Sequence, residues 1–465
     1  MKRSKRRLAI LMALILALFF GLILYMVYFE FVEAPGLRAD ARNMRNWVDE
    51  TQFGRGRFYD RHQHEIVGRE RQEDGTYVRY VNHPNMYSHL IGYNSKMYGK
   101  TGLESALNAR LLNLPGDNPI AALRGQVLNE GVGNDAVLTI DNDLQYEAYT
   151  ALEGHKGAAV ILNPKTGEVL AMVSLPSFNL NTMEDDWSSL VEDDEGRLFP
   201  RATQGLYAPG SVMKPITALA LLEAGVDLNY EDTGQTTVEG KTYQNYNGNA
   251  YGSIGLMEAL MHSSNVYFID KTKDLSADAL GDAAASFGFN QPLPFEVKTA
   301  QSVAPYEEGM DTNQKVSNAF GQGDVLVTPL QMAVAYGALA NGGKVMRPYV
   351  VSHWLSPKGA TLAPTGTQVL ESIDSAHVRT IDKALQATAD ENGLSERVGE
   401  AVAGKTGTAQ TSGDSTNAWT IAYAPADKPR VLVALVLEDD GRTGGEAALP
   451  LVADLLRTAL QETEE

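Results

Sequence analysis

The stretch Gly157-Ala-Ala-Val-Ile-Leu-Asn-Pro-Lys-Thr-Gly-Glu-Val-Leu-Ala-Met-Val173 carries two apolar runs, one on each side of a turn. Residues 157–162 and 168–173 predict buried strands, because each is a short apolar run rich in branched side chains. The segment between them has turn chemistry, since its proline fixes one φ angle and its closing glycine permits a positive one. The sequence therefore predicts a β-hairpin over residues 157–173.

Further elements are predicted downstream of this hairpin. They are helices over 216–224, 328–336 and 449–460 and strands over 418–423 and 431–437. The segment Asp227–Tyr251, rich in Gly, Asn and Tyr, is expected to be a loop. Because strands stand at both ends of this region and helices between them, we expect an α+β domain that opens near Val137, with a sheet built from sequence-distant segments.

Composition excludes several classes of function. The 465 residues carry a net charge of −19, which argues against nucleic acid as a partner. The chain has no cysteine, so disulfides and thiolate chemistry are excluded. His62 and His64 form a His-x-His pair in a predicted turn, but no third ligand is evident, and we expect a surface role. No metal ion or cofactor is predicted.

A membrane anchor is predicted near the N-terminus. Leu8–Phe29 is an uncharged apolar run of 22 residues, long enough to cross about 30 Å of hydrocarbon as a helix. Five basic residues lie within residues 2–7, so the positive-inside rule places the N-terminus in the cytoplasm and the rest of the chain outside. The alternative is a cleaved signal peptide, which has a shorter apolar core and a small-residue cleavage site, whereas Glu30–Glu33 follows here. We therefore expect a single-pass protein of the plasma membrane.

Three short motifs occur in one order along the outer portion: Ser211-Val-Met-Lys214, Ser263-Ser-Asn265 and Lys405-Thr-Gly-Thr408. Lys-Thr-Gly occurs three times, starting at Lys100, Lys165 and Lys405, and Ser-x-Asn also occurs three times. Ser-x-x-Lys occurs once, and only Ser263-Ser-Asn265 lies between it and the last Lys-Thr-Gly. The ordered set therefore has one solution. The Lys165 copy is interpreted as the turn of the hairpin and the Lys100 copy as a loop.

These motifs contain the groups of a serine acyl-transfer site. A serine hydroxyl needs a neighbouring base, and Lys214 can serve if burial or a nearby cation such as Lys405 keeps it neutral. We expect Ser211 at a helix N-terminus, with Lys214 one turn later on the same face. Ser263 can relay protons, and Asn265 can donate to a substrate amide. The residues expected to bind a substrate carboxylate and backbone are Lys405, Thr406, Gly407 and Thr408.

The chain resembles the class B penicillin-binding proteins, and among them the short members of the penicillin-binding protein A type. The resemblance rests on Gly54–Val67, on Tyr207-Ala-Pro-Gly-Ser-Val-Met-Lys-Pro215 and on Ala403-Gly-Lys-Thr-Gly-Thr-Ala-Gln410. It departs from the usual pattern at Pro200-Arg-Ala202, where Asn-Arg-Ala is common, and at Val212-Met213, where Thr-Phe is common. Neither change touches a reactive group.

The resemblance implies a peptidoglycan D,D-transpeptidase that is inhibited by β-lactams. Its domain has a central antiparallel sheet flanked by helices, and Ser211 attacks the D-Ala-D-Ala carbonyl of a stem pentapeptide. The backbone N–H groups of Ser211 and Thr408 are expected to form the oxyanion hole. About a hundred residues separate the anchor from the catalytic domain, too few for a glycosyltransferase domain. By the same resemblance, a multi-pass SEDS-type polymerase is expected as a partner.

The predicted organisation has four parts. They are a cytoplasmic tail over 1–7, a transmembrane anchor over 8–29, a short pedestal over 30–135 and a transpeptidase domain over 136–465. Two rival functions remain open. One is hydrolysis, by a D,D-carboxypeptidase or a β-lactamase, although Glu307, Glu308 and Asn313 do not fit the Glu-x-x-x-Asn spacing of a class A lactamase. The other is a non-catalytic β-lactam sensor or wall-assembly scaffold.

Overall fold

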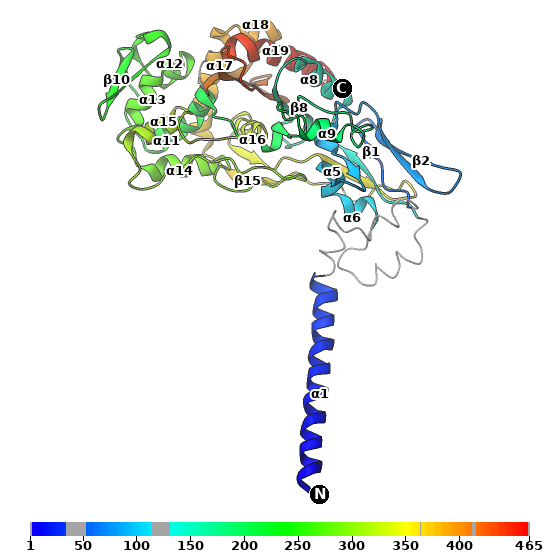
Figure 1. The fold of residues 1–465 in the computed structure, drawn as a ribbon. Helices are drawn as coiled ribbons and strands as arrows, with labels where there is room; N and C mark the ends of the chain where they lie inside the picture. The colour runs from blue at the N-terminus through cyan, green and yellow to red at the C-terminus, as the bar shows by residue number, and fades with distance from the viewer. Residues whose placement is uncertain (1, 34–52, 114–130, 363, 412–414, 464–465) are drawn as a thin grey trace.

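A five-stranded antiparallel sheet forms the centre of the folded body, in the order β16-β17-β18-β7-β8 (Figure 1). The computed structural model describes residues 2–33, 53–113, 131–362, 364–411 and 415–463. The strands are β7 (Gly157–Leu162), β8 (Val169–Leu175), β16 (Ala403–Gln410), β17 (Thr416–Ala424) and β18 (Val431–Leu437). The predicted hairpin and the predicted α+β sheet built from both ends of the domain are confirmed.

Side chains of this sheet alternate between two apolar layers, which explains why its strands are continuous apolar runs. Ala158 and Val160 pack in the core that also contains residues of α11 and α16. Ala159 and Ile161 face the opposite side, where residues of α8 and α19 cover them. The helices are α8 (Asn142–Ala151), α11 (Lys214–Glu223), α16 (Pro329–Ala340) and α19 (Gly444–Glu462). Because both faces are buried, the strand sequences do not alternate between polar and apolar residues and are apolar throughout.

A second five-stranded sheet, in the order β14-β6-β1-β2-β3, occupies the N-terminal end of the body. Its strands are β1 (Phe58–Tyr59), β2 (Glu65–Arg71), β3 (Tyr77–Val81), β6 (Asp135–Leu138) and β14 (Val351–Leu355). The turn predicted at His62 and His64 lies between β1 and β2. The predicted boundary at residue 135 falls inside β6, which pairs with β1 on one side and β14 on the other. The division into pedestal and catalytic domain remains a prediction, and 34–52 and 114–130 lie outside the described residues.

The segment Asp227–Tyr251, expected as a loop, contains three short strands. They are β9 (Tyr230–Asp232), β10 (Gln235–Val238) and β11 (Lys241–Gln244), and β12 (Gly252–Ile254) follows and pairs with β9. Glu239 and Gly240 join β10 to β11 with φ angles of 44° and 82°, which is the geometry of a tight hairpin turn. The loop prediction was wrong here because Thr, Tyr and Val favour strands even among polar neighbours.

The N-terminal helix α1 (Lys2–Tyr28) stands clear of the folded body in Figure 1 and continues into a π-helical turn over Phe29–Glu33. It coincides with the predicted anchor. Among the residues that the structure describes, no helix combines the length and the apolar character that a membrane crossing requires. The anchor therefore stays a prediction from the sequence.

Candidate active site

The proposed nucleophile, Ser211, lies in a 3-10 turn (η2, Gly210–Met213) that leads directly into α11. The side chains after it, Val212 and Met213, are buried, whereas Ser211 is only half-buried. Gly210 donates its N–H to the carbonyl of Gly321 at 2.8 Å and has a φ of 57°. The chain therefore presents the Ser211 hydroxyl from a turn that is fixed on both sides, as predicted for a helix start.

Lys214 is fully buried one turn after Ser211. Its Nζ donates to the carbonyl oxygen of Ser263 at 2.6 Å and to Asn265 Oδ1 at 2.8 Å, and it lies 3.2 Å from Ser263 Oγ. The structure thus brings together the first two motifs, although 49 residues separate Lys214 from Ser263. Within the described residues, the Ser211 hydroxyl has no hydrogen-bond partner, so it is available to a substrate.

The second motif fills the junction between α12 (Leu256–Met261) and α13 (Asn265–Thr272). Ser263 has a φ of 58°, in the left-handed region that non-glycine residues seldom adopt. Ser264 is the N-cap of α13, because its hydroxyl accepts from the N–H of Tyr267. The motif ends a helix, but the side chains of Ser263 and Asn265 also contact Lys214, which indicates a role in the site as well.

The third motif lies on β16, the edge strand of the central sheet. Lys405 and Gly407 are buried, whereas Thr406 and Thr408 on the other face are half-buried. Thr408 Oγ1 accepts from the N–H of Gly444, at the start of α19, at 3.1 Å. An edge strand has a free row of backbone groups with which an extended peptide can pair.

Glycines allow β16 to lie against the turn that holds the nucleophile. A Cβ on Gly407 would lie 3.0 Å from the backbone nitrogen of Val212, and a Cβ on Gly210 would lie 2.6 Å from the carbonyl oxygen of Thr408. The two backbones are therefore in direct contact. This brings Ser211 next to Thr408, as the predicted oxyanion hole requires, although its N–H geometry remains a prediction.

The charge state of the site follows from burial. Burial, and secondarily the charge of Lys405, lowers the pKa of Lys214 well below its usual value. Burial also lowers the pKa of Lys405, to about 7. Lys405 Nζ donates to the carbonyl of Thr406 at 3.1 Å, which leaves two of its three donors for a ligand. The lowered pKa favours the neutral amine of Lys214, which can accept a proton, while Lys405 is poised to bind an anion.

The loop Gly321-Gln-Gly323 also contributes to the site, and the sequence did not predict this role. Gly321-Gln-Gly323 has Gly-x-Gly spacing without the preceding strand of a phosphate-binding loop, which made it weak evidence for such a site. In the structure, Gly321 has a φ of 87°, and a Cβ there would lie 1.8 Å from the carbonyl oxygen of Gly210. Gly321 therefore supports the Ser211 turn, whereas Gly323 lies against Ser317 and Asn318. The signal for this role was a glycine pair without dinucleotide spacing, which indicates close backbone approach.

The other two Lys-Thr-Gly copies lie elsewhere. Lys165 is exposed in the β7–β8 turn, as predicted. Lys100 was expected in a loop but ends the short strand β5 (Gly99–Lys100), and Thr101 precedes α5 (Gly102–Ala106). The two histidines of the His-x-His pair bind different carboxylates: His62 contacts Asp141, and His64 contacts Asp60.

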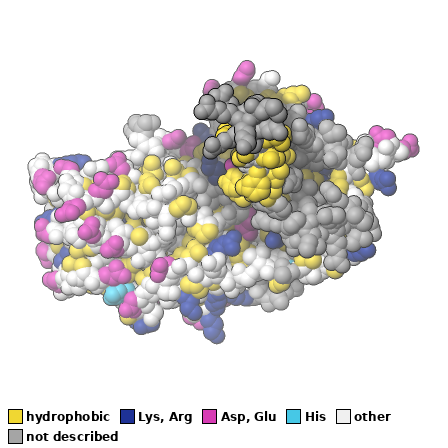
Figure 2. Space-filling model, turned by 90° about the horizontal axis from the view of Figure 1, so that it is seen from below, with side chains coloured by type: hydrophobic (Ala, Val, Ile, Leu, Met, Phe, Trp, Pro, Cys, Tyr) yellow, Lys and Arg dark blue, Asp and Glu magenta, His cyan; other side chains and the backbone are white. Residues whose placement is uncertain are grey.

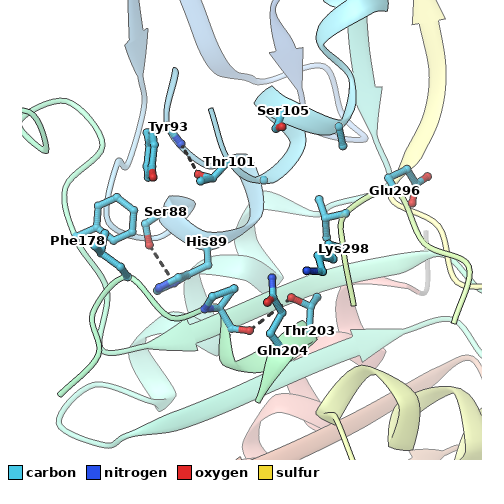
Figure 3. Close-up of a pocket in the computed structure, with 15 residues that line it drawn as sticks. Ser88, His89, Tyr93, Thr101, Ser105, Phe178, Thr203, Gln204, Glu296 and Lys298 are labelled. Atoms are coloured by element: carbon cyan, nitrogen blue, oxygen red, sulfur yellow. Dashed lines mark hydrogen bonds between the residues drawn. The ribbon is translucent and has the colours of Figure 1, made fainter. Parts of the chain in front are cut away.

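A cavity of about 500 Å³ lies away from this site, between α4 (Ser88–Ile91) and α5 on one side and α10 (Arg201–Gln204) on the other (Figure 3). Ser88 and His89 line it, with Ser88 Oγ 3.2 Å from His89 Nδ1. Burial lowers the pKa of His89 to about 4, which makes it a weak base. With so low a pKa, His89 is a poor base for the Ser88 hydroxyl, and no catalytic role is assigned to this pair.

Comparison with known proteins places this geometry in a family. Residues 157–457 match the penicillin-binding protein transpeptidase domain, and residues 55–123 match the penicillin-binding protein A dimerisation domain. The chain is 32% identical, over 501 aligned positions, to the peptidoglycan D,D-transpeptidase PbpA of Mycolicibacterium smegmatis, with 99% of this chain and 100% of that protein covered. Identity to the protein of the same name from Mycobacterium tuberculosis is also 32%, with 99% of each covered.

A solved structure agrees with this assignment. Penicillin-binding protein A from M. tuberculosis, as a ceftriaxone acyl-enzyme complex, superposes with a TM-score of 0.83 at 28% identity, covering 89% of this chain and 100% of that one. The transpeptidase match alone spans more than half of the sequence. The chain therefore belongs to the penicillin-binding protein family.

Proposed function

We propose that Ser211 is the nucleophile with which this protein, a peptidoglycan D,D-transpeptidase, forms its acyl-enzyme. The observation that carries the proposal is the buried Lys214, one turn from Ser211, whose Nζ reaches Ser263 and Asn265. Burial and the charge of Lys405 lower the pKa of Lys214, so a neutral amine is available as the base that a serine nucleophile needs.

The reaction follows from these positions. The Ser211 oxygen attacks the carbonyl carbon of the penultimate D-Ala while its proton passes to Lys214. The tetrahedral intermediate then loses the terminal D-Ala, whose amine takes the proton through Ser263, and the acyl chain stays on Ser211. An amine of a neighbouring stem attacks this ester, gives its proton back along the same route and restores the serine hydroxyl.

Substrate binding is assigned to β16. The terminal carboxylate binds to Lys405, Thr406 and Thr408, and the substrate backbone pairs with the free edge of the strand. Gly407 keeps this strand close enough to η2 for the scissile carbonyl to reach Ser211. Asn265 donates to the amide of the substrate.

The test is intact-protein mass spectrometry after incubation with benzylpenicillin. We expect the mass of one penicilloyl group, located on the peptide that contains Ser211 and persisting for many minutes. Ser211→Ala is the matched control and should gain no mass. Absence of an adduct on the wild-type protein would overturn the assignment, and rapid release of hydrolysed penicillin would favour a β-lactamase.

Transpeptidation is distinguished from carboxypeptidase activity by the fate of the acyl group. With a D-Ala-D-Ala pentapeptide and a stem peptide bearing a free amine, we expect a cross-linked dimer and free D-Ala. Cleavage to the tetrapeptide alone, at any concentration of the amine, would assign a D,D-carboxypeptidase instead.

Membrane attachment through the N-terminal helix is also proposed. The support is the apolar run Leu8–Phe29, the basic residues before it, and the exposed apolar side chains of α1 between Ile10 and Tyr28. Figure 2 shows apolar side chains of this helix in front of the folded body. A periplasmic or extracytoplasmic reporter fused after Glu465 should be active, whereas a cytoplasmic reporter at the same place should not. A mature protein that begins near Ala34 would show cleavage and overturn the anchor.

A SEDS-type glycan polymerase is proposed as the partner. The support is the length of the segment between the apolar run and the transpeptidase match: residues 30–156 are too few for a glycosyltransferase domain. Co-purification of a multi-pass polymerase with the full chain from detergent-solubilised membranes tests this pairing.

A further inference from the structure

Two buried polar side chains, Asp232 and Asn245, lie behind the second motif. Asp232 ends β9 and Asn245 directly follows β11, so both come from the segment that the sequence presented as a loop. The two residues are 1% and 4% exposed. Burial of a carboxylate is unfavourable unless hydrogen bonds compensate its charge. The groups that donate to Asp232 are therefore held in fixed positions.

The partners of Asp232 account for both of its oxygens. Ser264 Oγ donates to Oδ2 at 2.5 Å, and the side-chain amide of Asn245 donates to both oxygens at 2.9 Å. The N–H of Gly234 donates to Oδ1 at 2.8 Å. Charge-assisted hydrogen bonds of this kind are shorter and stronger than neutral ones. The carboxylate therefore fixes the orientation of Ser264 and of Asn245 at once.

Those two residues in turn fix the start of α13. Ser264 Oγ accepts from the N–H of Tyr267, and Asn245 Oδ1 accepts from the N–H of Val266 at 3.0 Å. The residues on either side of Ser264 are Ser263 and Asn265, which accept the hydrogen bonds of Lys214. A chain of hydrogen bonds thus runs from Asp232 to the groups that hold the base.

The backbone of Ser263 increases the need for such support. Its φ of 58° is unfavourable for a residue with a Cβ, and conformations of this kind persist only where the surroundings hold them. Asn265 is anchored on its other side by its Nδ2, which donates to the carbonyl of Gln244, the residue before Asn245. The β9–β11 segment therefore contacts the motif directly at Ser264 and Asn265, and it reaches Ser263 only through its neighbour Ser264.

We infer that Asp232 and Asn245 are positioning residues of the transpeptidase, which act through Ser264 to hold Ser263 and Asn265 against Lys214. The inference rests on the proposed function of Ser211. Neither residue touches the substrate or the reacting atoms. Their contribution is to keep the proton relay aligned, and misalignment by about 1 Å can lower a rate about 100-fold.

The test compares acylation of Asp232→Asn, Ser264→Ala and the double variant by benzylpenicillin in the full chain. Asp232→Asn keeps the size of the side chain and removes its charge, and Ser264→Ala removes one hydroxyl. We expect the limiting acylation rate to fall between about 10-fold and 100-fold. The half-saturating concentration should change less, because Lys405 and Thr408 still bind the carboxylate.

Asp270→Asn is the matched control. Asp270 also joins α13 to β9 and β10, since it accepts from Tyr230 and Thr236, but it lies beyond the motif. We expect this variant to lower Tm without lowering the limiting rate. Because Asp232 and Ser264 belong to one hydrogen-bond network, the fall in the limiting rate of the double variant should be smaller than the product of the falls in the two single variants.

Several results would overturn the inference. One is that the limiting acylation rates of Asp232→Asn and Asp270→Asn stand in the same relation to the Tm values of the two variants. Another is a double variant whose fall in limiting acylation rate equals the product of the falls in the two single variants. If Asp232→Asn does not fold, an unchanged limiting rate in the milder Ser264→Ala variant overturns it equally. A wild-type protein that is not acylated at all would refute the proposed function itself, which separates the two failures.

Discussion

The two buried lysines of the site have opposite tasks, and their pKa values suit them. Lys214 must be neutral to take a proton, and burial with the nearby charge of Lys405 lowers its pKa. Lys405 must be charged to bind a carboxylate, yet burial lowers its pKa to about 7. In the free protein the Lys405 charge is therefore lost as the pH rises through neutrality.

This difference predicts how acylation depends on pH. The second-order rate constant reports the free enzyme, so it should fall as the pH rises above about 7, where Lys405 loses its proton. A bound carboxylate raises the pKa of Lys405, so the limiting rate should persist to higher pH. Acylation rates between about pH 5 and about pH 9 measure both constants. Lys405→Arg is the control, because a guanidinium stays charged and should abolish the alkaline fall. A second-order constant that rises steadily to about pH 9 would contradict this account.

A second residue-scale prediction separates function from stability. Lys405 is 2% exposed, and a buried ammonium with few partners is unfavourable, so Lys405→Met should raise the free energy of unfolding by ~1 kcal/mol. Acylation should fall by a factor of about 100 or more, because the carboxylate contact is lost. Lys165→Met, in the exposed β7–β8 turn, should leave both the free energy of unfolding and the acylation rate nearly unchanged. Chemical denaturation and acylation rates of the two variants provide the measurement, and a crippled Lys165→Met with a normal Lys405→Met would reverse the motif assignment.

At the scale of elements, the nucleophile depends on a close contact between two turns. Gly321→Ala would place a Cβ 1.8 Å from the carbonyl oxygen of Gly210, at a residue with a φ of 87°. We expect a loss of ~2–4 kcal/mol in the free energy of unfolding and slower acylation, because the Ser211 turn must shift. Gly359→Ala is matched in backbone angle, with a φ of 77°, but its Cβ would meet nothing within 4 Å. It should cost ~1 kcal/mol and leave acylation unchanged. Equal acylation rates in the two variants would contradict this role of Gly321.

The sequence predicted those elements whose signal is local. The apolar runs of β7, β8 and β18 and the helix α11 follow directly from composition and from a Gly cap at Gly225. The three motifs were predicted because their residue types and order are specific. The β9–β11 segment was missed, since its strands are polar and its turn, Glu239-Gly240, lacks the usual Asn-Gly signature. Asp232 and Asn245 were missed with it, because their partners become adjacent only in the folded chain.

The pairing of strands that are distant in the sequence could not be predicted either. β14 joins the N-terminal sheet by pairing with β6, although more than two hundred residues separate them. Its sequence, Val351-Ser-His-Trp-Leu355, predicts no particular partner. Pairing between distant strands depends on the whole fold, so a single sequence without local periodicity cannot specify it.

For the whole molecule, the N-terminal part and the catalytic part share one apolar core. Phe58, Leu90 and Leu103 belong to the same buried cluster as Val160 and Ile216 of the catalytic region. Arg110 also stacks over the ring of Trp354 in β14, at 5.3 Å from its centroid. The described residues of the predicted pedestal therefore share a core with the catalytic part, and the division into two domains remains a prediction.

This shared core predicts how fragments behave. A chain that starts at residue 136 loses β1 as the partner of β6 and exposes the core that Phe58, Leu90 and Leu103 cover. Each buried side chain of this kind contributes about 1.5–3 kcal/mol, so losing several exceeds much of the 5–15 kcal/mol that stabilises a typical domain. We therefore expect fragment 136–465 to aggregate and to resist acylation. Fragment 53–465 should elute as a single species and react with benzylpenicillin at the rate of the full chain. Size-exclusion chromatography with acylation assays compares the two. A soluble 136–465 fragment with a cooperative unfolding transition and normal acylation would show that the catalytic domain folds alone and that the common core is dispensable.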